Sequence, residues 1–243
     1  MDCIGVIPAR FSSSRFQGKI LADICGKPMI QHVWERAKTA LALDGLIIAC
    51  DDETVAKTAA NFGAKVVLTA KGHVCGTDRI IEVVNPLDVK IVINIQADEP
   101  LIEPVMIDQL AQAMLCNKDI SMATLMKKIS RAHELNDPNI VKVVVDKNNF
   151  ALYFSRSVIP HRAQGCEVKS PVYYKHIGLY AYTKDFLFIY KNLPVSNLEK
   201  IEKLEQLRVL EEGFRIKVIE TNVETIGVDT PEDLEKVKKF LNK

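Results

Sequence analysis

The chain has 243 residues, of which 48% are hydrophobic and 26% are charged, a composition typical of one α/β domain or of one domain with a sizeable insertion. Its 32 Lys and Arg residues are balanced by 31 Asp and Glu residues, so the net charge predicts neither nucleic-acid binding nor attraction to an anionic membrane. No apolar run approaches the roughly 20 residues of a membrane-spanning helix, so we expect no membrane insertion.

The first half of the chain alternates strand-like and helix-like segments. The run 89–95 (VKIVINI) is almost entirely apolar and β-branched, which is typical of a central strand covered on both faces. Acidic residues at 51–53 mark the start of a helix that ends near Phe62. In this half we expect strands at 3–8, 46–50, 65–68 and 89–95, and further helices at about 29–43, 77–84 and 104–115.

The pattern changes after about residue 118, where short strand-like runs are separated by polar segments. We expect strands at 121–125, 141–145, 151–155, 177–182 and 215–220, helices at about 198–212 and 232–241, and a surface loop at about 161–171. The fold class is therefore α/β, with a mainly parallel central sheet sandwiched by helices and a smaller mixed-sheet lobe. We expect a single domain over 1–243, with parts at about 1–118, 119–225 and 226–243.

The six cysteines are scattered without a C-x-x-C pair, and the five histidines lack metal-binding spacing. In a chain of this size the pattern indicates reduced thiols in a cytoplasmic protein and makes a zinc site improbable. The first residues lack the features of a secretory signal, which agrees with that location.

The loop after the first strand carries the first candidate site, because ligands of open parallel sheets bind at the carboxyl ends of the strands. Residues 7–19 (IPARFSSSRFQGK) combine Arg10, Arg15 and Lys19 with three serines and a glycine. A triphosphate requires such cations, hydroxyls and accessible backbone N–H groups. The loop is not a Walker A motif, since Ile20 follows the Gly-Lys pair. A solvated polar loop explains the pattern equally well.

Carboxylates form the second candidate site. Asp98 and Glu99 follow the buried 89–95 run, and Mg²⁺ is held by a few carboxylates together with phosphate oxygens. A helix-capping turn is the weaker alternative, because the pair follows a predicted buried strand and so lies where a ligand is expected. Asp229, just before the last predicted helix, would complete a metal site with Asp98, although it could equally cap that helix with Pro231 at the first position.

Other candidates are individually weaker. The segment 76–79 (GTDR) opens a predicted helix whose free N–H groups could attract an anion, but Thr77 could equally be an ordinary N-cap. Arg156 could hold a carboxylate in bidentate fashion or could be a surface arginine. For His176 and Glu205 we favour a packed histidine and an exposed helix residue.

With these residues in view, the sequence resembles the CMP-Kdo synthetase (3-deoxy-manno-octulosonate cytidylyltransferase) family over essentially its whole length. The resemblance is carried by IPARFSSSRFQGK (7–19), CGKPMIQHVWERA (25–37), GTDR (76–79), NIQADEP (94–100), PNIVKVV (138–144), ALYFSRSVIP (151–160), KHIGLYAY (175–182), LEKIEKLEQLRVLEEG (198–213) and GVDTPEDLEKV (227–237). It implies a glycosyltransferase-A-like nucleotidyltransferase fold and a cytoplasmic homodimer. In that fold the first part would bind the nucleotide, the second would bind the sugar and form the dimer, and the last helix would return to the core.

The resemblance also implies an activity and its residues: transfer of CMP from CTP to the acidic sugar Kdo, with release of pyrophosphate and with Mg²⁺ as cofactor, for lipopolysaccharide synthesis. The catalytic residues would be Arg10, Lys19, Asp98 and Asp229, the two aspartates being the metal ligands. The nucleotide would be bound by Ala9, Arg10, Ser13, Arg15, Lys19, Arg79 and Gln96. The sugar would be bound by Arg156, His176, Tyr180, Glu205 and Gln206.

Three positions depart from the family pattern: Gln17 replaces Pro, Cys75 replaces Ser, and Ala97 replaces Gly, which requires a backbone conformation that tolerates a Cβ. None removes a charged group. Two alternatives stay open: a cytidylyltransferase for a related acidic sugar, such as an amino-Kdo variant or sialic acid, and a catalytically silent nucleotide-binding protein. The silent protein predicts loss of the acidic pair or of the basic loop, yet both are present.

Overall fold

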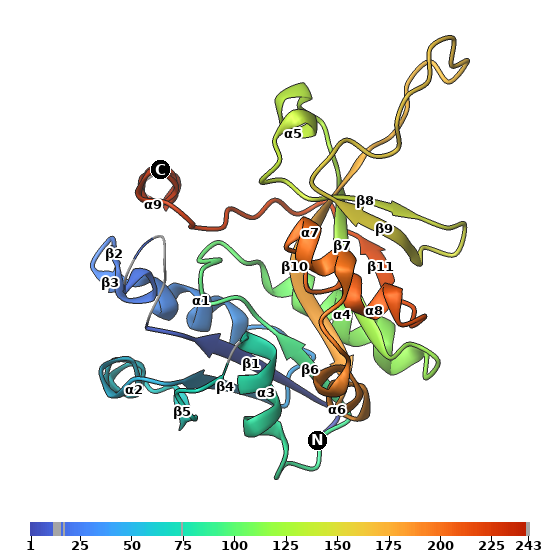
Figure 1. Ribbon diagram of the computed structural model, residues 1–243. Coiled ribbons are helices and arrows are strands. Elements are labelled where there is room, and N and C mark those ends of the chain that lie inside the picture. Colours follow the sequence, from blue (N-terminus) through green and yellow to red (C-terminus); the bar gives the residue numbers. More distant parts are fainter. Residues whose placement is uncertain (12–15, 17, 74, 242–243) are drawn as a thin grey trace.

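The computed structural model describes residues 1–11, 16, 18–73 and 75–241 (Figure 1). Its strands are β1 (Cys3–Ala9), β2 (Asp23–Ile24), β3 (Lys27–Pro28), β4 (Gly45–Cys50), β5 (Lys65–Leu68), β6 (Ile91–Asn94), β7 (Met122–Lys128), β8 (Lys142–Val145), β9 (Ala151–Ser155), β10 (Tyr174–Thr183) and β11 (Lys217–Glu220). Its helices are the 3₁₀ helix η1 (Lys19–Leu21), α1 (Met29–Ala37), α2 (Glu53–Asn61), α3 (Gly76–Val84), α4 (Pro104–Cys116), α5 (Ala132–Asn136), α6 (Lys184–Asn192), α7 (Asn197–Glu202), α8 (Leu207–Glu211) and α9 (Pro231–Leu241).

One nine-stranded sheet organises the described part of the chain, with neighbours in the order β11-β7-β10-β6-β1-β4-β5 and with β8 and β9 attached to β10. β1 lies parallel to β4 and β6, and β4 lies parallel to β5. β10 runs antiparallel between β6 and β7, while β11 is parallel to β7. The predicted α/β class is confirmed, and the strands of the smaller mixed lobe prove to be continuous with the central sheet.

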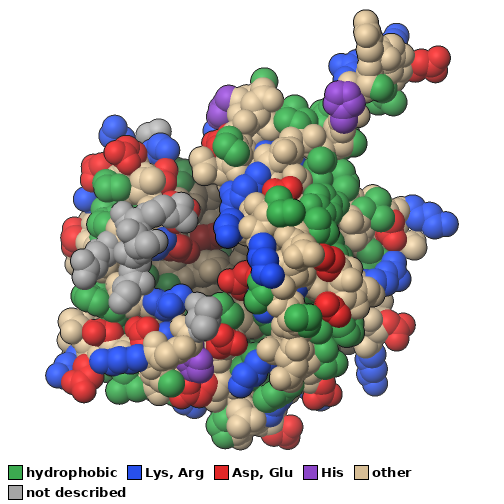
Figure 2. Space-filling model, in the orientation of Figure 1, with side chains coloured by type: hydrophobic (Ala, Val, Ile, Leu, Met, Phe, Trp, Pro, Cys, Tyr) green, Lys and Arg blue, Asp and Glu red, His purple; other side chains and the backbone are tan. Residues whose placement is uncertain are grey.

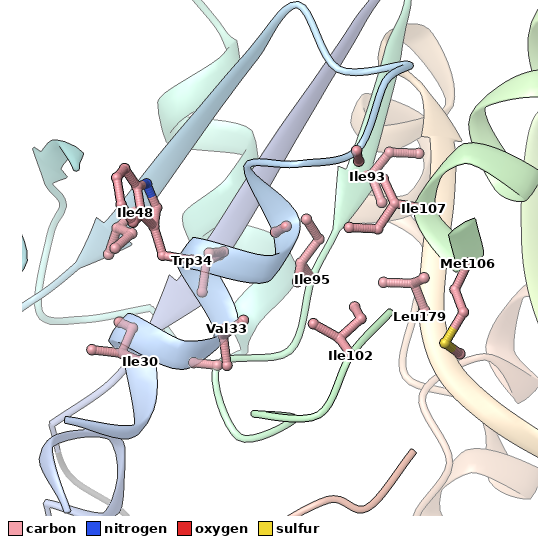
Figure 3. Packing of buried hydrophobic residues seen from close by; sticks show 14 of the residues in the cluster. Ile30, Val33, Trp34, Ile48, Ile93, Ile95, Ile102, Met106, Ile107 and Leu179 are labelled. Carbon is pink, nitrogen blue, oxygen red and sulfur yellow. The ribbon is translucent and has the colours of Figure 1, made fainter. Parts of the chain in front are cut away.

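Helices cover both faces of this sheet because consecutive residues of each central strand point to opposite faces. In β1, Ile4 and Val6 join the core under α3, α6 and α8, whereas Ile7 joins the core under α1, α4 and α9. Figure 3 shows the second core, where Val33 and Trp34 of α1 lie among isoleucines of β4 and β6. No helix within the described ranges is both long and apolar enough to cross a membrane.

The predicted helix at 198–212 is wrong, because the chain forms two short helices there. Lys203 ends α7 in the left-handed region, with φ of 56°, and α8 begins only at Leu207. The turn between them places Glu205 and Gln206 on the wall of a cleft, as described below. Sequence periodicity also missed α6, although the Thr183 side chain caps it by accepting a hydrogen bond from the Phe186 N–H.

The segment 221–230, which we call the strap, connects β11 to α9. It crosses from the half of the molecule that contains β11 to the half that contains β1 and α1 (Figure 1). The Lys127 ammonium donates to the Asn222 carbonyl at 2.9 Å. Further along, the Val228 N–H donates to the Asp98 carbonyl at 2.8 Å. These bonds fix the strap against the loop that follows β6.

Candidate active site

A cleft of about 430 Å³ opens at the carboxyl ends of β1 and β6, where the sheet order predicts a ligand site. A second hollow of about 800 Å³, next to the strap, shares Gly178 and Asp229 with it. Figure 2 shows the surface hollowed between the two halves of the molecule. The cleft is lined by residues of both halves, among them Pro8, Gly76, Thr77, Asn94, Gln96, Arg156, Gly178, Tyr180, Tyr182, Tyr190, Glu205, Gln206 and Asp229.

Three predicted site residues meet at one edge of the cleft. The Lys19 ammonium donates to Asp98 Oδ2 at 2.6 Å and to Asp229 Oδ1 at 3.2 Å. It also donates to the Val228 carbonyl at 3.0 Å. Two aspartates 131 positions apart in the sequence therefore converge on one cation, which in this structure is the lysine ammonium.

Local structure explains this convergence. Gly18 adopts a φ of 67°, a conformation that favours glycine, and thereby turns the chain into η1, which begins at Lys19. Asp98 lies four residues beyond the end of β6, and the hydrogen bond from the Val228 N–H to the Asp98 carbonyl places the strap beside it. Asp229 is the next residue on the strap.

Glu99, the other member of the predicted acidic pair, faces the strap instead. Its Oε2 accepts a hydrogen bond from the Thr225 hydroxyl at 2.9 Å. Burial, together with the neighbouring charge of Asp98, raises the pKa of Glu99 to about 7. Only one carboxylate of the pair thus belongs to the cluster around Lys19.

The predicted nucleotide-binding residues are only partly placed together. Ala9 ends β1, and the exposed Arg10 donates to the His73 carbonyl at 3.3 Å. Gln96 lines the cleft and donates from Nε2 to Asn94 Oδ1 at 3.3 Å. Ser13 and Arg15 lie outside the described residues, as does Gln17.

Arg79 does not line the cleft as the nucleotide-binding prediction requires. Its guanidinium is fully buried, where it donates to the Thr69 hydroxyl and to Asp51 Oδ2, the latter at 2.8 Å. Asp51 Oδ1 in turn accepts from the Phe11 N–H at 3.3 Å, at the start of the basic loop. Arg79 therefore supports the start of that loop indirectly, by holding Asp51. Its place at a helix N-terminus predicted a nearby anion, but the sequence did not show that this anion is Asp51.

Removing the charge of Asp51 should destabilise the protein strongly. Asp51→Asn leaves the buried Arg79 cation without its counter-ion, and we expect the free energy of unfolding to fall by about 3–5 kcal/mol. Urea unfolding at neutral pH measures the difference. The control is Glu53→Gln, which breaks an exposed 3.8 Å pair with Lys57 and should change stability by no more than about 0.5 kcal/mol. Equal effects of the two substitutions would contradict the account of Arg79.

On the opposite wall, Arg156 and Gln206 face the cleft. Arg156 Nε donates to the Glu202 carbonyl at 2.8 Å and Nη1 to the Pro138 carbonyl at 3.0 Å, so its position is fixed from both sides. Gln206 is only 4% exposed, and its Nε2 has no hydrogen-bond partner among the residues that the structure describes. A buried amide donor without a partner costs free energy, and a ligand oxygen in the cleft would satisfy it.

Tyr180 and Glu205 line the same cleft, whereas His176 lines the second hollow. Partial burial raises the pKa of Glu205, although the nearby Arg208 opposes the shift. His176 Nε2 lies 2.9 Å from the Thr124 hydroxyl, and its ring lies 5.4 Å from that of Tyr180, centroid to centroid. The predicted sugar residues thus lie on two sides of Gly178, not in one pocket.

The pH dependence of stability tests the environment of His176. Burial lowers the pKa of His176 to about 3, below the value of about 6.5 expected in the unfolded chain. The folded state therefore favours the neutral ring, a contribution fully present above about pH 6.5 and lost as the pH falls toward 3. From pH 7 to pH 4, wild-type unfolding free energy should fall more steeply than that of His176→Gln.

Urea unfolding at each pH gives the two curves. Loss of the contact with Thr124 offsets the His176→Gln curve at every pH, so the slope carries the information. The matched control is His161→Gln in the exposed loop, which should follow the wild type. Parallel curves for wild type and His176→Gln would contradict a buried neutral histidine.

Several cleft residues were not predicted from the sequence: Asn94, Tyr182, Tyr190 and Gly178. Two of them carried a usable signal, since Gly178 and Tyr182 lie at even spacing from Tyr180 on one strand and so share its face. Asn94 ends β6, where a polar residue after an apolar run marks the edge of the sheet. Tyr190 lies on α6, which the sequence analysis missed.

The departures from the family pattern are accommodated where the structure describes them. Ala97 is not among the residues with positive φ in these ranges, so its Cβ creates no backbone strain. Cys75 precedes α3 with an extended backbone, and its N–H donates to Asp78 Oδ2 at 3.4 Å. Burial, together with the charge of Glu205, raises the pKa of Cys75 to about 11, so the thiol stays protonated at neutral pH.

Comparison with known proteins identifies the family of the chain. A family described as cytidylyltransferase matches residues 4–226, so the fold and the cleft define a nucleotidyltransferase of this class. A relative from Solibacter usitatus (strain Ellin6076), named 3-deoxy-manno-octulosonate cytidylyltransferase, is 52% identical over 238 residues, which cover 98% of this chain and 93% of the relative. A relative of the same name from Geotalea uraniireducens (strain Rf4) is 48% identical over 251 residues, with both chains fully covered. The chain therefore belongs to the 3-deoxy-manno-octulosonate cytidylyltransferase family.

Solved structures extend the comparison. A structure described as CMP:2-keto-3-deoxy-manno-octonic acid synthetase complexed with CTP matches with a TM-score of 0.93 and 44% identity, covering 100% of this chain and 99% of the other. A cytidylyltransferase from Leptospira borgpetersenii serovar Hardjo-bovis (strain JB197) matches with a TM-score of 0.65 and 16% identity, covering 100% of this chain and 87% of the other. The second match shows the shared fold alone.

Proposed function

We propose that this protein transfers CMP from CTP to 3-deoxy-manno-octulosonate (Kdo), giving CMP-Kdo and pyrophosphate. The observation that carries the proposal is the convergence of Asp98 and Asp229 on one cation at the edge of the cleft. The family gives this cluster its chemistry, since its members are named for cytidylyl transfer to this sugar. The same resemblance supports a cytoplasmic homodimer that serves lipopolysaccharide synthesis.

The donor atoms at this cluster fit Mg²⁺. Within the described residues, the Lys19 ammonium donates to three oxygens, two from carboxylates and one from a carbonyl. Among the residues placed by the structure, no group of three or more His, Cys, Asp or Glu side chains could hold an ion. Mg²⁺ is commonly held by one or two carboxylates together with substrate phosphates, which is what Asp98 and Asp229 offer. Bound there, Mg²⁺ would supply positive charge to the α-phosphate and to the attacking hydroxyl.

The reaction is an in-line displacement. The anomeric hydroxyl oxygen of Kdo forms a bond to the α-phosphorus of CTP, the bond from that phosphorus to pyrophosphate breaks, and the hydroxyl proton is lost to solvent. Arg10 and Lys19 would stabilise the charge that develops on the leaving pyrophosphate. Lys19 must first leave the two carboxylates, because its ammonium lies between them.

Residues on the far wall hold the acceptor sugar. Arg156 would pair with the Kdo carboxylate, since a guanidinium matches carboxylate geometry. Gln206 Nε2, which has no hydrogen-bond partner within the described chain, would donate to a sugar oxygen. Tyr180 and Glu205 lie within the same cleft and would contact the ring hydroxyls.

Pyrophosphate release tests the proposal directly. CTP, ATP, GTP and UTP are each supplied with and without Kdo and with and without Mg²⁺. Release that requires CTP, Kdo and Mg²⁺ together supports the proposal. Release with amino-Kdo or sialic acid but not with Kdo would replace the sugar, and no release with any acidic sugar would support the catalytically silent alternative.

A further inference from the structure

The strand β10 carries three rings on one face, of which Tyr180 and Tyr182 line the cleft and His176 lines the second hollow. The rings of Tyr180 and Tyr182 are stacked with centroids 6.0 Å apart, and His176 lies on the other side of Gly178. Gly178 lines both the cleft and the second hollow. It therefore lies where the two spaces join.

The space beside Gly178 is open. A Cβ at Gly178 would meet no heavy atom of the described residues within 4 Å, its two chain neighbours aside, and its φ is not in the left-handed region. Neither backbone conformation nor packing therefore requires glycine at this position. Close approach of a ligand to the backbone is one physical reason for a glycine within a strand, and a bulge is another. The open space beside Gly178, where the two hollows join, leaves room for such a ligand.

A buried hydroxyl fixes the backbone around Gly178. The register of β10 against β7 shifts between Ile177 and Tyr180, which marks a bulge around Gly178. The fully buried Thr124 hydroxyl lies 3.1 Å from the Ile177 carbonyl and 2.9 Å from the Leu179 carbonyl. His176 Nε2 lies 2.9 Å from the same hydroxyl oxygen. Bulges next to binding sites redirect side chains in this way.

We propose that Gly178 sets the size of the acceptor sugar that the site can hold. The sugar would lie across the bulge, between the Gln206 wall of the cleft and Asp229. This inference rests on the proposed function and specifies how that site selects its acidic sugar. A side chain at position 178 fills the space between the cleft and the second hollow. It excludes an extended acceptor without disturbing the nucleotide, whose predicted residues within the described ranges lie on or just after β1, on η1, on α3 and two residues beyond β6.

Graded substitutions test the proposal. In Gly178→Ala the KM for Kdo should rise about tenfold, and in Gly178→Val it should rise at least about 100-fold. The KM for CTP should stay within about twofold of wild type in both variants, because the substitution affects only the space for the sugar. Equal rises in both KM values would instead indicate a global change. Thermal unfolding should be unchanged, since the added atoms meet open space. The matched control is Gly45→Ala, a strand glycine away from both hollows whose Cβ would lie 3.8 Å from Ile4.

The outcomes separate the two proposals. An unchanged KM for Kdo in the folded Val variant overturns the role of Gly178, as does an equal rise in KM for CTP and Kdo. If the Val variant does not fold, the Ala variant alone decides, with an unchanged KM for Kdo again overturning the role. Wild-type protein that releases no pyrophosphate with CTP and Kdo overturns the proposed function itself, and this is seen before any variant is made.

Discussion

Asp98→Asn is expected to lower the turnover of CTP and Kdo by at least about 100-fold while leaving the fold intact. The amide keeps the shape of the side chain but loses the negative charge that would hold a divalent cation. The backbone carbonyl of Asp98, which accepts from the Val228 N–H, is unaffected, so the strap stays in place. Steady-state pyrophosphate release measures turnover, and calorimetry measures Tm.

The matched control is Asp119→Asn, an exposed aspartate after α4 that should retain wild-type turnover. The double variant of Asp98 and Asp229 sharpens the test. If both carboxylates hold the same cation, the double variant should be scarcely slower than either single variant, because residues that act as a unit are not additive. Near-normal turnover in Asp98→Asn refutes its role as a metal ligand.

Lys19→Met is expected to have two large and opposite effects. Turnover should fall by about 10²–10³-fold, because one cation that offsets charge on the leaving pyrophosphate is lost. The affinity of the substrate-free protein for Mn²⁺ should instead rise about tenfold or more, since Asp98 and Asp229 then lack the ammonium that lies between them. Turnover is followed by pyrophosphate release, and Mn²⁺ binding by electron paramagnetic resonance titration.

Lys27→Met serves as the control for Lys19→Met, since Lys27 pairs with Glu35 at the exposed end of α1 and away from the cleft. It should change neither turnover nor Mn²⁺ affinity. A lower Mn²⁺ affinity in Lys19→Met would mean that the lysine supports the cation site and does not compete for it. Unchanged turnover would remove Lys19 from the reaction.

Sequence patterns predicted the parts of this molecule that depend on local regularity. The almost entirely apolar 89–95 run was correctly expected to be a central strand, because only a strand covered on both faces needs such a composition. The loop at 161–171 was also correctly expected, since residues 161–173 form neither helix nor strand. The placement of Asp98 beyond β6 follows from the same strand.

Local sequence patterns could not predict features that depend on a single backbone angle or on residues far apart in the chain. The periodicity at 198–212 suits one helix, but Lys203 turns the chain and thereby brings Gln206 to the cleft. Arg79 had the sequence signal of an anion site, yet its anion is Asp51 of the same chain. The bulge at Gly178 depends on Thr124, which lies 54 positions earlier, so the spacing of β10 alone does not reveal it.

The strap couples the positions of the two aspartates at the proposed cation site. Because the Val228 N–H is bonded to the Asp98 carbonyl, moving the strap away from the loop after β6 separates the two aspartates at the same time. A cation that contacts both aspartates would therefore also hold the strap against that loop. By linkage, the free energy that it gains from contacting both carboxylates would add to the free energy needed to detach the strap.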